Sequence, residues 1–254
     1  MALPVPGLRA VRAALDSDLR VRRLLVARGP EAKGAVVAIL RSAEDRGIRV
    51  EAVERSDLDR VAGGSGHQGI VALVEPPEPA DLQEVLDTLE RDGTRPFLLA
   101  LDGIQDPQNL GAILRAADGA GVHAVIVPER GAAQLSPGVV RASAGAALFV
   151  PLIGVPNLAQ ALRSLSKSGI RIVGASPGQK KSHSAEDLGG ALVLVIGGES
   201  DGLRESVRDQ CDRLVTIPMR GRTASLNAAA AAAVLLFEAV RQRGTSRGTD
   251  PPRG

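Results

Sequence analysis

The chain has 254 residues, 44% of them hydrophobic, which is enough for two ordinary domains with apolar cores. Three Phe and no Trp or Tyr argue against RNA recognition by aromatic stacking platforms. The formal net charge is only +2, so binding of RNA or phosphate would have to come from local basic patches. A single cysteine, Cys211, excludes an internal disulfide bond and a multi-cysteine metal site.

The N-terminal residues 1–20 carry charges where a signal peptide has an apolar core, and no apolar run is long enough to span a membrane. We therefore expect a soluble cytoplasmic protein without membrane contact. The three histidines (His67, His123 and His183) are scattered along the chain, and we expect structural or surface roles for them. No metal site is expected.

Helical and strand patterns alternate over residues 7–74 and predict a small α/β module. Helices are expected at 7–17, 31–47 and 56–62, the last capped by Ser56, and strands at 22–27, 48–53 and 69–74. We place the first domain at residues 1–75. A proline-rich linker and a leading helix at 81–93 then occupy residues 76–94.

Apolar runs separated mostly by helical patterns predict a second α/β domain over residues 95–242. Strands are expected at 97–101, 123–127, 148–153, 170–175, 191–196 and 213–217. Continuous apolar strands alternating with helices are typical of a parallel sheet covered on both faces. Residues 243–254 are rich in Arg, Gly and Pro and are expected to form a disordered basic tail. A solvated terminus without a role is favoured over a tail that contacts RNA.

The glycine-rich turn after the 191–196 run does not have the features of a phosphate-binding loop. Gly197 and Gly202 have the spacing of a P-loop, but Leu203 and Arg204 stand where Lys and Ser or Thr are required. Glu199 and Asp201 would repel a pyrophosphate. The turn therefore favours a cationic or hydroxyl-bearing ligand, and a nucleotide- or NAD-using enzyme is the weaker interpretation.

Two other polar stretches carry candidate functional residues. The first, LDGIQDPQNLGAILRAADGAGVHAVIVP (101–128), has Asn109 at the expected start of a helix as its cap, and Arg115 follows within two turns. The second is VTIPMRGRTASLNAAAAAAVLLFE (215–238), where Ser225 or Asn227 is expected to cap the final helix. Six alanines (228–233) begin this helix, which suggests that another part of the molecule comes close to its first two turns.

These three stretches, in this order and spacing, resemble the signature motifs of the SpoU (TrmH) family of RNA ribose 2′-O-methyltransferases, within the SPOUT superfamily. The first module resembles the ribosomal-protein-like RNA-binding domain of the branch that methylates a guanosine of 23S rRNA, including the turn GSGHQGIVALV (64–74). The resemblance implies a parallel sheet with a C-terminal trefoil knot, S-adenosyl-L-methionine as cofactor, and a homodimer formed through the knotted domain. Small side chains at 228–233 would let the helix approach the cofactor loops.

The resemblance also implies roles for particular residues. The positions that match the family's catalytic polar residues are Asn109, Arg115, Glu199, Ser225 and Asn227. The positions that match its cofactor-binding residues are Gly197, Gly198, Ile217, Met219 and Leu226. Glycine at 197 would allow a ligand to approach the backbone closely. Because a guanidinium stays protonated at pH 7, we expect Arg115 to hold a phosphate and stabilise a developing alkoxide, in place of the role of base proposed in the family.

Basic residues expected to contact RNA lie in both modules. We expect the protein to recognise the shape, the phosphates and the 2′-hydroxyls of the RNA. They are Arg22 and Arg23, Arg141 at the opening of a short helix, and Arg220 and Arg222. The first module favours 23S rRNA as the substrate. Methylation of tRNA, an rRNA methylation that confers antibiotic resistance, and a non-catalytic RNA-binding or ribosome-assembly factor remain the alternatives.

Overall fold

The computed structural model describes residues 2–29, 34–198 and 201–245. The chain divides into two compact units. One comprises the described residues up to Glu78 together with Leu110–Arg115 and Gln134–Phe149, and the other comprises the rest of the described chain. The expected tail at 243–254 begins inside a helix, which continues to Thr245, and residues 246–254 lie outside the described residues.

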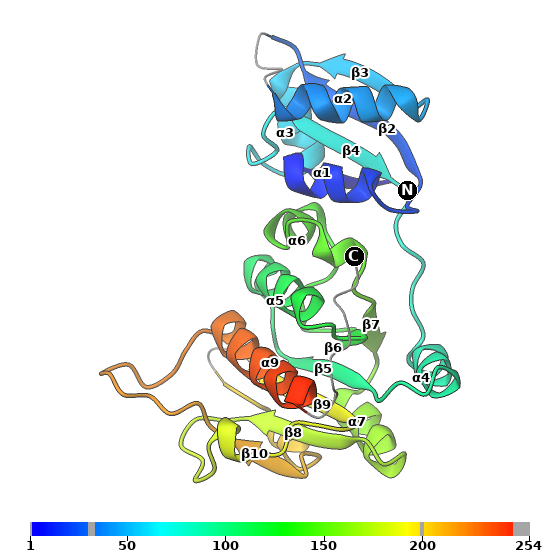
Figure 1. The fold of residues 1–254 in the computed structure, drawn as a ribbon. Coiled ribbons are helices and arrows are strands. Elements are labelled where there is room, and N and C mark those ends of the chain that lie inside the picture. Colours follow the sequence, from blue (N-terminus) through cyan, green and yellow to red (C-terminus); the bar gives the residue numbers. More distant parts are fainter. Residues whose placement is uncertain (1, 30–33, 199–200, 246–254) are drawn as a thin grey trace. The chain divides into compact units, whose positions relative to one another are not determined.

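The N-terminal sheet has four strands in the order β1-β4-β2-β3 (Figure 1). The strands are β1 (Leu3–Pro6), β2 (Val21–Ala27), β3 (Arg49–Val53) and β4 (Ile70–Val74), and the helices are α1 (Leu8–Leu15), α2 (Ala35–Asp45) and α3 (Arg55–Ala62). β2 pairs parallel with β3, and β4 pairs antiparallel with β1 and β2. The sequence did not predict β1, because its two prolines weaken any strand pattern; they are tolerated at an edge.

A buried cluster of Leu25, Leu58, Ala62 and Val71 packs α3 against this sheet. The prediction that Ser56 caps α3 is wrong. The carbonyl oxygen of Glu54 already accepts the amides of Asp57 and Leu58, so the helix begins at Arg55. The position of this helix is therefore set by burial of its apolar face and not by a hydroxyl cap.

The second sheet confirms the α/β class that the sequence predicted. Its six strands lie in the order β10-β8-β9-β5-β6-β7, and every neighbouring pair is parallel. They are β5 (Phe97–Asp102), β6 (Ala124–Pro128), β7 (Leu152–Val155), β8 (Arg171–Ala175), β9 (Leu192–Gly197) and β10 (Arg213–Val215). The strand predicted at 148–153 is wrong in its first half, because Gly145 (φ 99°) leads into a 3₁₀ turn, Ala146–Leu148.

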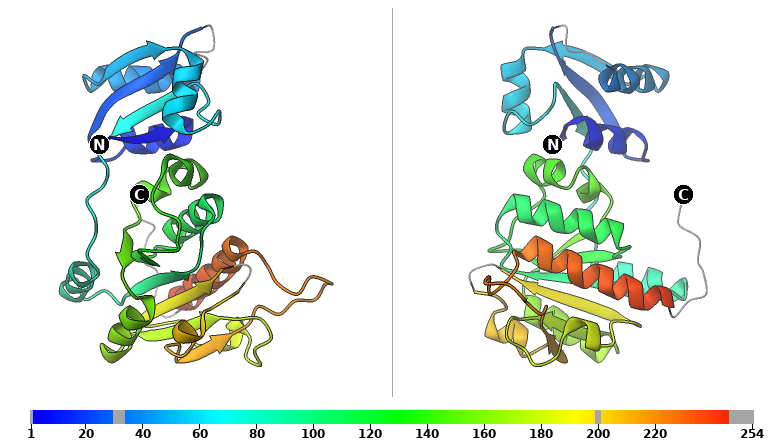
Figure 2. Two further views of the ribbon diagram at one scale, coloured as in Figure 1. Left: turned by 180° about the vertical axis from the view of Figure 1, so that it is seen from behind. Right: turned by 60° about the vertical axis from the view of Figure 1, so that its left-hand side comes forward.

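Helices cover both faces of this sheet (Figures 1 and 2). The helices after β4 are α4 (Leu82–Arg91), α5 (Pro107–Gly119), α6 (Pro137–Ala142), α7 (Leu158–Lys167), α8 (Glu205–Arg208) and α9 (Ala228–Thr245), with a second 3₁₀ turn at His183–Ala185. Of these, α6 belongs to the first compact unit. α7 packs Leu158, Leu162 and Leu165 into the core on one face, with apolar residues of α4 and α8. α9 lies along the other face, against β9.

The strand order places a topological switch point between β5 and β9. From β5 the chain builds outward through β6 and β7, and β9 pairs with the other edge of β5. In parallel sheets of this kind ligands bind beyond the carboxyl ends of the strands at such a point. The motif-bearing turns after β5, β9 and β10 all begin at this edge. The C-terminal knot stays a prediction.

Candidate functional site

A cavity of about 550 Å³ lies beyond the carboxyl ends of β8, β9 and β10. Its wall comes from the ends of these strands, the loop after β9, the loop before α9 and the first turn of α9. The wall includes all the residues expected at the cofactor, together with one residue expected in catalysis: Gly197, Gly198, Ile217, Met219, Leu226 and Ser225. Residues more than 20 positions apart in the sequence therefore line the same cavity.

The loop after β9 is closely packed where it can be described. A Cβ built on Gly197 would lie 2.2 Å from the carbonyl carbon of Gly202. The amide of Gly202 (φ 63°) donates to the carbonyl oxygen of Gly198 at 3.1 Å. The expectation was that glycine at 197 lets a ligand approach the backbone, whereas the protein's own backbone occupies this space.

Asp102, at the end of β5, fixes the far side of this loop. Its side chain is buried and accepts hydrogen bonds from the backbone amide of Arg204 (2.8 Å) and from the Nε of Arg204 (2.7 Å). The amide of Gly198 donates to the backbone carbonyl of Asp102 at 2.8 Å. Neither contact was predicted from the sequence: Asp102 had no expected role, and Arg204 was noted only as a departure from a P-loop. A carboxylate at the end of an apolar strand was the available signal.

The loop before α9 is open by comparison. Residues 220–227 are exposed, and no hydrogen bond of residues 217–226 with the described part of the chain is found. Asn227 ends the loop: its Oδ1 accepts the amide of Ala230 at 2.8 Å and caps α9, one of the two predicted caps. Ala228 is buried, and Ala228 and Ala231 line the cavity, so small side chains do stand where the helix meets the loops.

The other predicted catalytic residues belong to α5 or lie outside the described residues. Asn109 is not the cap of α5, because Asp106 is: its Oδ1 accepts the amide of Gln108 at 3.0 Å. Asn109 therefore lies within the first turn of the helix. Arg115 is exposed and makes no ion pair or hydrogen bond with another described residue. Glu199 lies outside the described residues.

The glycine of the first motif permits a close approach of α5 and α6. A Cβ on Gly111 would lie 2.4 Å from the Cβ of Ala142 and 2.9 Å from the amide of Ser143. Ser136 caps α6 by accepting the amide of Val139, so Arg141 lies near the end of this helix. The prediction that Arg141 opens it is wrong, since the signals of Ser136 and Pro137 set the start.

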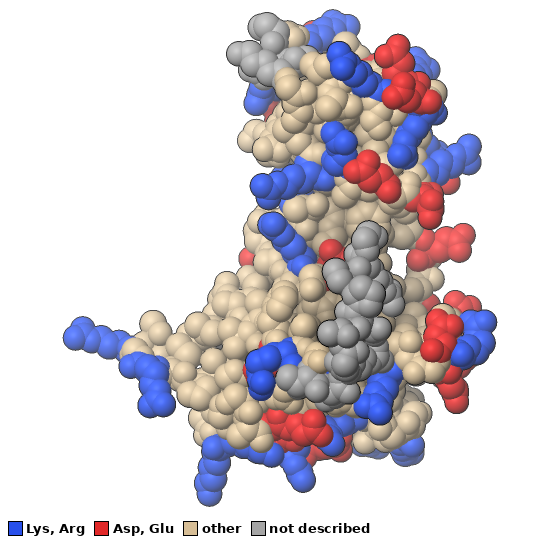
Figure 3. Space-filling model, viewed as in Figure 1, with Lys and Arg blue, Asp and Glu red and all other residues tan. Residues whose placement is uncertain are grey.

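Four of the five basic residues expected to contact RNA fall into two groups; the fifth, Arg141, has a buried Nη1 without a hydrogen-bond partner among the described residues. Arg22 pairs with Glu75 (3.0 Å) and Arg23 pairs with Glu51 (2.9 Å), so both charges are partly neutralised. Arg220 and Arg222 are exposed in the loop before α9 and pair with no described residue. Figure 3 shows basic side chains at the tip of this loop.

The histidines and the cysteine have structural environments. His67 is fully buried and lies 3.1 Å from Asp59, the Nδ1 of His123 accepts the amide of Phe97, and His183 lies beside the carbonyl of Thr216. Burial raises the pKa of the Cys211 thiol to about 12, with the charge of Asp212 as a smaller cause. Cys211 is therefore a thiol and not a thiolate at neutral pH.

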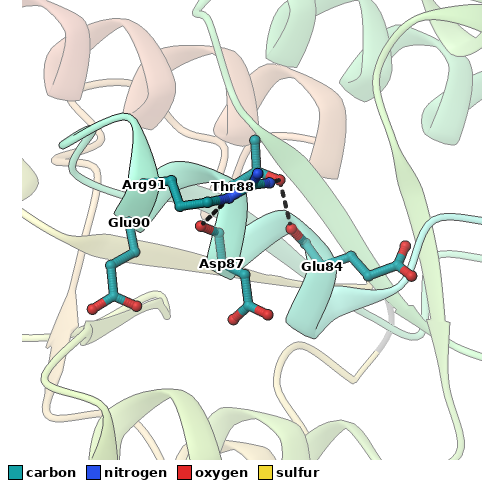
Figure 4. A pocket seen from close by; sticks show the side chains of 5 residues that line it. All are labelled: Glu84, Asp87, Thr88, Glu90 and Arg91. Atoms are coloured by element: carbon teal, nitrogen blue, oxygen red, sulfur yellow. Dashed lines mark hydrogen bonds between the residues drawn. The ribbon is translucent and has the colours of Figure 1, made fainter.

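A second hollow, of about 610 Å³, lies on α4 (Figure 4). Its side chains all come from this one helix, and its polar groups serve the helix itself. Thr88 Oγ1 donates to the carbonyl of Glu84 (2.8 Å), and Arg91 donates to Thr88 Oγ1 (3.0 Å). No described residue from another element lines this hollow, so it is not a candidate site. The cavity at the strand ends is the candidate site because residues of the second and third motifs line it.

No described helix combines the length and the apolar character needed to cross a membrane. No group of three or more His, Cys, Asp or Glu side chains in the described ranges could hold a metal ion.

The chain belongs to the SpoU rRNA methylase family. The model of that family matches residues 96–237, and a second model, described as RNA 2′-O ribose methyltransferase substrate binding, matches residues 4–80. The 23S rRNA (guanosine-2′-O-)-methyltransferase RlmB of Escherichia coli K12 is 40% identical over 96% of this chain and all of its own length. The RlmB of Pectobacterium atrosepticum is 43% identical over 94% of this chain and 97% of its own.

Among solved structures, the SpoU methyltransferase AviRb of Streptomyces viridochromogenes, in complex with the cofactor AdoMet, superposes with a TM-score of 0.76 at 30% identity. The match covers 95% of this chain and 90% of that chain. The family resemblance drawn from the three motifs is thereby confirmed.

Proposed function

We propose that this protein transfers a methyl group from S-adenosylmethionine to the 2′-hydroxyl of a guanosine ribose in 23S rRNA. The observation that carries the proposal is similarity along the whole chain to RlmB proteins, in both the methylase and the substrate-binding segments. The cavity at the switch point supplies a site in which such a reaction could occur. We also propose a cytoplasmic location, because the proposed substrate is ribosomal RNA.

The test is methyl transfer from labelled S-adenosylmethionine to separate pools of rRNA and tRNA. A 2′-O-methylated ribose makes the adjoining phosphodiester linkage resistant to alkali, so the label can be mapped. One labelled linkage in 23S rRNA, at a guanosine, is the expected result. Label in tRNA would overturn the substrate, and cofactor binding without transfer to any RNA would favour an assembly factor.

The cavity has the chemistry that this cofactor requires. Its volume of about 550 Å³ lies within the range of small-molecule pockets. Ile196, Leu203 and Val215 offer an apolar surface for an adenine ring. Asp201 and Arg208 bring charges of both signs, which suits the amino and carboxylate groups of the methionine part. The residues proposed to hold it are Gly197, Gly198, Ile217, Met219 and Leu226.

When bound, S-adenosylmethionine supplies a methyl group activated by its positive sulfonium. The chain must then position the ribose hydroxyl and stabilise the negative charge that its oxygen develops as its proton leaves. The exposed guanidinium of Arg115 is proposed to hold the neighbouring phosphate and stabilise this charge. Asn109, Ser225 and Asn227 are proposed to position the ribose, and Glu199 to orient Arg115 or Asn109.

Replacing Arg115 tests the catalytic part of the proposal. Arg115→Ala should lower kcat about 100-fold or more, because a donor aimed at developing charge is lost. Arg115→Lys should also fail, since lysine keeps the charge but lacks the planar fork. Affinity for S-adenosylhomocysteine should not change. Near-normal turnover of Arg115→Ala would refute the role.

We propose that α9 forms part of a homodimer interface. Ala230, Val234 and Phe237 share one exposed side of this helix, and Val234 and Phe237 are 38% and 50% exposed. Large apolar side chains in one exposed row favour contact with another protein surface. Phe237→Glu should therefore give a monomer in light scattering, where the unaltered chain gives a dimer. A monomeric unaltered chain would overturn the interface.

A further inference from the structure

The buried carboxylate of Asp102 and the loop after β9 form one assembly that the proposed catalytic residues do not include. Three bonds join them: Gly198 N–H to the Asp102 carbonyl, and the backbone amide and Nε of Arg204 to the Asp102 carboxylate. The side chain of Asp102 has no exposed surface, whereas that of Arg204 is 56% exposed. We call these contacts the Asp102–Arg204 clasp.

The clasp holds the described residues at the two ends of this loop, Gly198 and Arg204. Gly202 lies between them, and its φ of 63° is a backbone conformation that favours glycine. Gly197, Gly198, Gly202 and Leu203 all line the cavity. Since a Cβ on Gly198 would lie 2.8 Å from the carbonyl oxygen of Gly103, the loop also packs directly against the turn after β5.

We propose that Asp102 and Arg204 are positioning residues that hold Gly197, Gly198 and Gly202 in the arrangement that binds S-adenosylmethionine. They act through the backbone of Gly197 and Gly198 and do not themselves touch the cofactor. The same turn after β5 leads to Pro107 and Asn109, so the clasp also fixes the start of α5 relative to the cavity. This inference rests on the proposed function, because it presumes that the cavity takes this cofactor.

The ion pair by itself is a weak source of global stability. Exposed ion pairs contribute little, and Arg204 is more than half exposed. Removal of the Arg204 guanidinium instead leaves a buried carboxylate without its charged partner, which is unfavourable. A shift of the loop that hydrates or re-pairs this carboxylate would relieve the cost. A loss of the clasp should therefore appear in cofactor affinity before it appears in unfolding.

The experiment compares Arg204→Gln, Asp102→Asn and the double variant with the unaltered chain. S-adenosylhomocysteine binding is measured by calorimetry, and methyl transfer is measured with 23S rRNA over a range of S-adenosylmethionine concentrations. Each single variant should weaken S-adenosylhomocysteine binding and raise KM for S-adenosylmethionine about tenfold, while kcat at saturation and KM for RNA change less than about threefold. The double variant should lose no more than either single variant, since both break one contact.

Arg171→Gln is the matched control. Arg171 also pairs with an aspartate, Asp187 at 3.0 Å, but it does not line the cavity. It should leave binding of S-adenosylhomocysteine within about twofold. If Arg204→Gln lowers the melting temperature but leaves the Kd for S-adenosylhomocysteine unchanged, the clasp is merely structural and the inference is overturned. Because the side chain of Arg204 is 56% exposed, this variant should fold even if Asp102→Asn does not. Failure of the unaltered chain to bind S-adenosylhomocysteine would instead overturn the proposed function.

Discussion

Two loops line the same cavity but are built in opposite ways. The loop after β9 is anchored to β5 by the Asp102–Arg204 clasp, and its glycines touch protein backbone. The loop before α9 is exposed over residues 220–227 and carries two arginines that pair with no described residue. We propose that the loop after β9 forms a fixed wall of the cofactor site, and that the loop before α9 forms an open wall whose two arginines contact RNA.

The largest effect should come from adding one methyl group to the fixed wall. In Gly197→Ala the new Cβ would lie 2.2 Å from the backbone of Gly202, so the loop must shift. We expect a loss of about 3 kcal/mol, or ~100-fold, in S-adenosylhomocysteine binding. Gly221→Ala is the control in the open loop, where nothing lies within 4 Å, and its Kd should not change. Equal effects of the two variants would break the comparison.

A smaller effect is expected where α9 meets the cavity. Ala231 lines it, whereas its neighbour Ala230 is exposed. Ala231→Leu should weaken S-adenosylhomocysteine binding about tenfold, because three added carbons overfill the wall. Ala230→Leu should stay within about twofold in the same titration. If both variants bind like the unaltered chain, small side chains are not needed here.

The two arginines of the loop before α9, which do not line the cavity, should affect RNA binding and not cofactor binding. Replacing Arg220 and Arg222 together by Ala should weaken RNA binding several-fold and lower the slope of log K against log salt by about 1.4, if both contact single-stranded phosphates. Binding of S-adenosylhomocysteine should be unchanged. Arg91 and Arg163, replaced together, are the charge-matched control. An unchanged salt slope for the Arg220 and Arg222 variant would show that the loop does not reach RNA.

The smallest effect is expected in the C-terminal half of α9, the helix that follows the open loop. Hydrogen bonds from Arg241 and then Gln242 lower the pKa of Glu238 from 4.5 to about 2. A depressed carboxyl pKa stabilises the fold above pH 4.5, and this stability is lost as the pH falls towards 2. Between pH 7 and pH 2 the free energy of unfolding should therefore fall by about 1 kcal/mol less in Glu238→Gln than in the unaltered chain, as measured by urea unfolding. An identical pH profile for both chains would contradict the role.

The sequence predicted most of the fold because strand runs and helix periodicity are local signals. Five of the six strands of the second sheet overlap their expected ranges closely, whereas the 148–153 run failed because Gly145 diverts the backbone. The residues of the cavity wall were predicted because they match motifs, and not from geometry. The Asp102–Arg204 clasp was not predicted, since it joins residues 102 positions apart. Spacing alone also could not show that Asp106, and not Asn109, caps α5.

The environment of Cys211 has a practical consequence for studying these loops. Burial raises the pKa of the Cys211 thiol to about 12, so this side chain is far less ionised at pH 8 than a free cysteine. Maleimide reagents attack the thiolate, so the natural chain should be almost silent towards them. A cysteine introduced at the exposed position of Thr223 would then be the reactive one, and a spectroscopic label could report the motion of the open loop without any other substitution.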